Sequence, residues 1–147
     1  VDVAVLSPTP GVVRLYPLTS TGLPSTAILD AVAAICSHEK VRPLSDTVEV
    51  LAPVETAYTL TAQLTVYRSY DAATVLANAQ AQAAAFVATQ SAALGRDIVP
   101  SQIVAALSVT GVYRVDLAAP VATLEVGEEG WAHCTVIDVQ LAGSSDG

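Results

Sequence analysis

The chain has 147 residues, of which 52% are hydrophobic and 14% charged, so it has ample apolar surface to bury and disorder is disfavoured. Its formal net charge of −8 argues against binding to nucleic acid, because an acidic surface repels phosphate backbones. No apolar run approaches the ~18 residues of a membrane span, and no signal peptide is recognisable. Because the sequence contains no Met, even at position 1, we expect it to be part of a longer protein.

The first part of the chain predicts short strands around one helix. Ser25 is a good N-cap, because its hydroxyl can accept from the free N–H groups of the first turn. Pro17 has no backbone N–H, so we expect the strand that contains it to lie at a sheet edge or to end there. The predicted elements are strands at Val1–Leu6, Val12–Leu18 and Thr47–Ala52, with a helix from Ser25 to about Ser37 between the second and third.

The clearest signals are a long strand and the long helix that follows it. Apolar and polar residues alternate strictly through Ala57–Arg68, which predicts a central strand with Leu60 and Leu64 buried. Asp71 is placed to cap a helix that Gly95 would end in the left-handed conformation, about 36 Å later. Its apolar stripe is predicted to contain Val75, Leu76, Ala79, Ala83, Phe86, Val87 and Leu94.

The remaining sequence predicts one short helix and two or three strands. A helix is expected to begin at Pro100 or Ser101 and to end before Gly111. The expected strands lie at Val112–Leu117, with Tyr113, Val115 and Leu117 on one face, weakly at Ala122–Val126, and at Trp131–Leu141, before a loose end from Ser144 to Gly147.

Together these elements predict an α+β fold of two small two-layer modules. Residues 1–54 would form a β-β-α-β module and residues 55–147 a β-α-α-β-β module, each with a mixed or antiparallel sheet and its helices packed on one face.

No catalytic, cofactor or metal site is predicted. The soft metal ligands are Cys36, His38, His133 and Cys134, but neighbouring residues of a strand point to opposite faces, so zinc binding is disfavoured. We interpret both cysteines as small buried apolar side chains. The paired carboxylates of Glu128–Glu129 lie in a glycine-flanked segment, which is typical of a solvated turn. No nucleophile-elbow motif or phosphate loop is present, so we expect no enzymatic activity.

Two features are candidates for contacts with other subunits. The long helix is rich in alanine on more than one face, and Ala81, Ala84 and Ala85 would allow close backbone approach. Trp131 is the only tryptophan of the chain, and tryptophan is enriched at protein interfaces. The alternative for Trp131 is a strand-end residue that covers the core.

Several stretches, in the order in which they occur, carry a resemblance to a known family. They are Ser7–Val13, Gly22–Ser25, Val41–Val50, Leu94–Ile98 with Pro100–Ser101, and Gly111–Val115. With them, nearly the whole chain resembles the C-terminal half of the baseplate J family of contractile phage tails and related injection machines. Val41–Val50 and the segment from Leu94 to Val115 are the most specific, and neither carries catalytic residues. Family members are longer, which agrees with the missing Met.

The resemblance implies a structural, non-enzymatic wedge component of a tail baseplate. Its partners would be other wedge and hub proteins and copies of itself, with no nucleic acid and no cofactor. It would be assembled in the bacterial cytoplasm and would then reside in the virion or phage-like particle. The alternative, from another functional class, is a ferredoxin-like α+β module that senses a small molecule in a pocket between sheet and helices.

Overall fold

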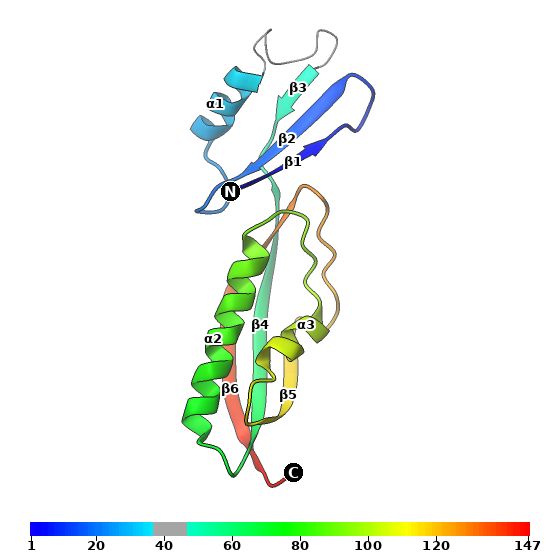
Figure 1. Ribbon diagram of the computed structural model, residues 1–147. Helices are drawn as coiled ribbons and strands as arrows, with labels where there is room; N and C mark the ends of the chain where they lie inside the picture. The colour runs from blue at the N-terminus through cyan, green and yellow to red at the C-terminus, as the bar shows by residue number, and fades with distance from the viewer. Residues whose placement is uncertain (37–46) are drawn as a thin grey trace.

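A computed structural model describes residues 1–36 and 47–147, and it contains two three-stranded sheets that follow one another along an elongated molecule (Figure 1). The predicted α+β fold and the predicted order of elements are confirmed. The predicted connection Val41–Asp46 and His38 lie outside the described residues. In chain order the elements are β1 (Asp2–Leu6), β2 (Val12–Leu18), α1 (Thr26–Cys36), β3 (Thr47–Val50), β4 (Val54–Tyr67), α2 (Ala72–Ser91), α3 (Pro100–Leu107), β5 (Val112–Ala119) and β6 (Gly130–Ser145).

The N-terminal unit, from β1 to β3, is a mixed sheet in the order β1-β2-β3 with α1 beside β3. β2 is antiparallel to β1 and parallel to β3, so it is the central strand and not an edge strand. It ends at Leu18, directly after Pro17, which is the other outcome that the sequence predicted. The proline is tolerated because the part of β2 that pairs with β3 is Val12–Leu15, which ends before Pro17. Among the strands that the structure describes, β1 alone therefore pairs with β2 at Pro17. Ser25 caps α1 as predicted, accepting from the backbone N–H of Ile28 at 3.4 Å.

The C-terminal unit, from β4 to β6, is a mixed sheet in the order β5-β4-β6, with β4 antiparallel to β5 and parallel to β6. β4 is the central strand, as its alternation predicted, and Leu60 and Leu64 are both 0% exposed. The helices α2 and α3 pack on this buried face of the sheet (Figure 1). The core contains Tyr58, Leu60, Ala62 and Leu64 of β4, Ala79 and Ala83 of α2, Ile103 and Leu107 of α3, and Val139 of β6.

Helix α2 begins where the sequence predicted but ends earlier. The Asp71 carboxylate accepts from the backbone N–H of Thr74 at 3.1 Å, which confirms the N-cap. The helix ends at Ser91 and not at Leu94, so its 20 residues span about 30 Å. Gly95 has a positive φ of 70°, but its N–H donates to the Gly130 carbonyl and not to α2. Gly95 therefore lies beyond the helix, whose C-cap is Ala92 with its N–H donating to the Thr89 carbonyl.

Strand β5 differs from the prediction in which side chains share its covered face. A register shift lies between the pairs Thr65–Arg114 and Val66–Val112, so Tyr113 is the extra residue of a β-bulge. Val112, and not Tyr113, joins Val115 and Leu117 against the core, whereas Tyr113 is 44% exposed.

Two predictions near the C-terminus were also wrong. The weak strand expected at Ala122–Val126 is only an isolated bridge between Leu124 and Ile98. Strand β6 continues to Ser145, where a loose end was expected, because Ser144 and Ser145 pair with the last residues of β4. The polar composition of this end reflects an edge strand that faces solvent.

Candidate interaction surfaces

Helix α2 presents an uncharged face to solvent. Its 20 residues include no acidic or basic side chain, although the whole chain carries a net charge of −8. Val75, Ala79 and Ala83 face the sheet and are buried. The predicted contact residues Ala81, Ala84 and Ala85 are all exposed. We name the outer face of α2 as the exposed stripe Ala77, Ala81, Ala84, Ala85 and Ala88, at the helical spacing of one face.

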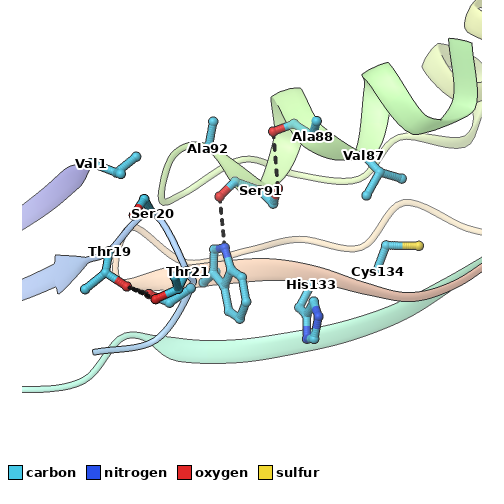
Figure 2. Close-up of a pocket in the computed structure, with 12 residues that line it drawn as sticks. Val1, Thr19, Ser20, Thr21, Val87, Ala88, Ser91, Ala92, His133 and Cys134 are labelled. Atoms are coloured by element: carbon cyan, nitrogen blue, oxygen red, sulfur yellow. Dashed lines mark hydrogen bonds between the residues drawn. The ribbon is translucent and has the colours of Figure 1, made fainter. Parts of the chain in front are cut away.

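Trp131, the other predicted contact residue, is only 8% exposed and lies where the two units meet. Its indole nitrogen donates to the carbonyl oxygen of Ser91, the last residue of α2, at 3.0 Å (Figure 2). Its ring lies against Gly22 of the N-terminal unit, so close that a Cβ atom at Gly22 would stand 2.8 Å from the ring atom Cη2. Trp131 therefore lies at the start of β6 and covers a joint within the chain, and its role as a contact with other subunits stays a prediction.

His133 and Glu55 extend the Trp131 cluster along the sheet. The imidazole of His133 stacks on the indole with 4.7 Å between ring centroids and 13° between the planes. Its Nδ1 lies 2.5 Å from a carboxylate oxygen of Glu55, and both side chains remain about two-fifths exposed. Beside the cluster is a cavity of about 500 Å³, lined by Thr19–Gly22 of the N-terminal unit and by the end of α2 and the start of β6 (Figure 2).

Cys134 is only partly buried, so the prediction of a buried cysteine holds in part, and the same is true of Cys36. The Cys134 thiol donates to the Val136 carbonyl at 3.1 Å, and burial raises its pKa. A raised thiol pKa lowers the thiolate fraction, which makes Cys134 a poor nucleophile. Burial also raises the pKa of Tyr58, whose hydroxyl has no hydrogen-bond partner in the described part of the chain.

The other side chains considered as metal ligands or catalytic carboxylates form no site together. Within residues 1–36 and 47–147, no three His, Cys, Asp or Glu side chains come close enough to hold a metal ion. Glu128 and Glu129 lie in the predicted turn, which a hydrogen bond of 2.7 Å from Gly130 N–H to the Gly127 carbonyl closes. None of the described helices is both long and apolar enough to cross a membrane.

The stretch from Leu94 to Ile98 has a structural role that the sequence did not reveal. The Arg96 guanidinium donates to the Thr89 carbonyl at 2.7 Å, near the end of α2. The Asp97 carboxylate accepts from the Val126 backbone N–H, also at 2.7 Å. Ile98 is 0% exposed and bridges to Leu124. The Arg96 contact ties the α2–α3 connection to the end of α2. The Asp97 and Ile98 contacts fasten it to the segment before β6, whose residues are too far along the chain to be predicted from it.

Comparisons with known proteins match each of the two units to a domain of one protein family. Residues 1–52 match the Baseplate J-like central domain, and residues 58–140 match the Baseplate J-like protein C-terminal domain. Baseplate protein J of Escherichia phage P2 is 35% identical over 147 residues, which is 99% of this chain and 48% of the relative. The chain thus spans about half the length of this relative. From these matches and the order of its elements, the chain belongs to the baseplate J-like family.

Proposed function

We propose that the chain is a structural, non-enzymatic part of a phage tail baseplate. The observation that carries this proposal is the 35% identity to a phage baseplate protein over 99% of the chain. The described geometry agrees with it, because the motif residues at Arg96 and Asp97 bind backbone atoms of this same chain. No comparison supports the small-molecule-sensing alternative.

The outer face of α2 is the contact surface that we propose for docking to other baseplate subunits. It is uncharged and formed by small side chains, so a partner's backbone can approach closely without desolvating a charge. A standard interface buries about 800 Å² per partner. A helix about 30 Å long would supply the centre of such an interface. Residues next to α2 on the same surface would form its rim. The proposed partners are other wedge and hub proteins and further copies of this protein.

The proposal also gives the location of the protein. The protein would be assembled with its partners in the bacterial cytoplasm and would then reside in the tail baseplate of the particle.

The division of the chain into one module of residues 1–54 and one of residues 55–147 stays a prediction. Limited proteolysis tests it: cleavage between β3 and β4 that leaves two resistant fragments supports two modules, whereas loss of all resistant material on that cleavage contradicts them.

Ala81→Arg in the full-length protein tests the contact surface. The substitution places a long charged side chain in the outer face of α2 at an exposed position of a helix, where folding tolerates it. Incorporation into particles in a reconstitution assay is expected to be lost. The matched control is Gln63→Arg, which adds the same charge at an exposed position of β4, on the face of the sheet opposite the helices.

The two variants give distinguishable outcomes. A folded Ala81→Arg protein that is excluded from particles, with Gln63→Arg incorporated normally, supports the contact surface. Normal incorporation of both variants removes α2 from the interface but leaves the baseplate role intact. Failure of the unmodified full-length protein to enter particles with other baseplate proteins contradicts the baseplate role itself.

A further inference from the structure

The two units meet at a small joint. In the part of the chain that the structure describes, every extensive contact between helices and strands lies within one unit or the other. Contacts across the joint come from individual residues at the N-terminus, in the loop after β2 and at the start of β6 (Figure 1). Interfaces this limited leave relative motion as the default expectation for two units of one chain.

The covalent connection at the joint is short, and it is anchored on both sides. On the β3 side, the backbone N–H of Leu51 donates to the Leu15 carbonyl at 2.8 Å. On the β4 side, the N–H of Val54 donates to the Glu129 carbonyl at 3.0 Å. Only Ala52 and Pro53 lie between these anchors. Any change in the angle between the units must therefore be absorbed at these two residues.

Trp131, which belongs to the C-terminal unit, holds the angle between the two units. The Ser91 carbonyl holds its indole N–H, and the stacked His133 ring covers it. The ring is thus fixed in its own unit while it presses on Gly22 of the other. Gly22 has no side chain, which this close approach requires. It also has a positive φ of 106° in the turn that it closes with Thr19, and glycine adopts this conformation without steric cost.

Asp2 forms the second point of attachment. Its carboxylate accepts from the backbone N–H of Leu94, just beyond α2, at 2.9 Å. This bond crosses from the first strand of the N-terminal unit to the C-terminal unit. Hydrogen bonds from backbone N–H groups, with that of Leu94 foremost, lower the pKa of Asp2, so the carboxylate is ionised when it makes this contact.

We propose that Trp131 and Asp2 form a releasable latch, and that the units rotate about Ala52–Pro53 when it opens. The latch consists of one aromatic ring against one glycine and one hydrogen bond, whereas each unit is held by its own sheet. Opening it leaves the core around Leu60 and Leu64 intact, because that core lies within the C-terminal unit. The chain therefore has a latched orientation and a free one.

Distances between spin labels measured by pulsed electron resonance test the latch. Asp30→Cys in α1 and Asn78→Cys in α2 place one label on an exposed position of each unit, in a background with Cys36→Ser and Cys134→Ser. The labelled parent is expected to give a single narrow distance. Trp131→Ala is expected to lose it and to give a broad distribution with the same far-UV circular dichroism.

The matched control is Tyr113→Ala, which removes an exposed aromatic side chain from the β5 bulge, away from the joint. It is expected to keep the parent distance. A broad distribution in the parent, or a narrow and unchanged one in Trp131→Ala, overturns the proposal. If Trp131→Ala does not fold, Asp2→Ala decides in the same way, because it releases the second attachment without touching the core. The test uses no particle, so its outcome is separate from that of the baseplate role.

Discussion

The indole N–H of Trp131 donates to the carbonyl oxygen of Ser91, the last residue of α2, across 3.0 Å. The last carbonyl groups of a helix have no partner within it, and a buried one left unpaired is costly. A side chain from β6 therefore completes the end of α2, and the Asp2 carboxylate pairs with the Leu94 N–H just beyond. The end of this helix is a tertiary feature, which explains why its sequence did not mark it.

Leu64→Ala tests the core of the C-terminal unit. Leu64 is 0% exposed in the central strand, so truncation removes buried methyl groups and leaves a cavity. The free energy of unfolding is expected to fall by about 2–5 kcal/mol. Urea denaturation measures it, with Gln63→Ala, at the exposed neighbouring position, expected to change it by less than about 0.5 kcal/mol. Equal effects of the two substitutions would contradict the assigned faces of β4.

The sequence predicted what depends on neighbours along the chain. The alternation of β4 and the caps at Ser25 and Asp71 are local signals, and the structure confirms them. The place of β2 in its sheet and the bulge at Tyr113 depend on which strands pair, and no local pattern carries that information.

The same distinction applies to the candidate contact surfaces. The exposure of Ala81, Ala84 and Ala85 follows from helical periodicity alone, given that Val75, Ala79 and Ala83 face the sheet. The position of Trp131 does not, because its contacts are Gly22 and Ser91, far away in the chain. A lone tryptophan beside a turn is compatible with either an exposed or a buried ring until those partners are known.

Gly22→Ala is expected to lower the free energy of unfolding by about 1–3 kcal/mol. The new Cβ would meet the Trp131 ring at 2.8 Å, and the φ of 106° disfavours any L side chain. Because Trp131 is the only tryptophan, its fluorescence reports this contact directly during urea denaturation. Gly143→Ala is the control, since a Cβ there meets nothing within 4 Å. A midpoint for Gly22→Ala as high as that of the control would show that the ring does not lie against Gly22.

Acid is expected to weaken the N-cap of α2. Hydrogen bonds from the hydroxyl and backbone N–H of Thr74 lower the pKa of Asp71 below its ordinary value of 3.8. A lowered folded-state pKa means that the cap stabilises fully above about pH 3.8 and that this stabilisation is lost as the pH falls through the folded-state value. Asp71→Asn keeps a capping oxygen without the charge. Thermal unfolding from pH 6 to pH 2 should therefore show a smaller decline in Tm for Asp71→Asn than for the parent. Parallel declines would contradict the role of this carboxylate.

Asp97→Ala tests the fastening of the α2–α3 connection. The Asp97 carboxylate accepts from the Val126 N–H at 2.7 Å, and Val126 is 7% exposed. Without it, that N–H has no partner in a largely covered position, which costs about 1–3 kcal/mol. The loss should be local, because Ile98 and Leu124 remain bridged beside it. Amide hydrogen exchange is therefore expected to accelerate at Val126 more than at Leu64 in β4.

Asp116→Ala is the matched control for Asp97→Ala. Within residues 1–36 and 47–147 its carboxylate pairs with Arg114 alone, and both side chains are more than half exposed. Exposed ion pairs contribute little to stability, so exchange at Val126 should stay as in the parent. If exchange at Val126 accelerates in Asp97→Ala alone, the segment from Leu94 to Ile98 fastens the α2–α3 connection in the fold. Unchanged exchange in both variants would mean that the carboxylate does not hold Val126, and the motif would then need another explanation.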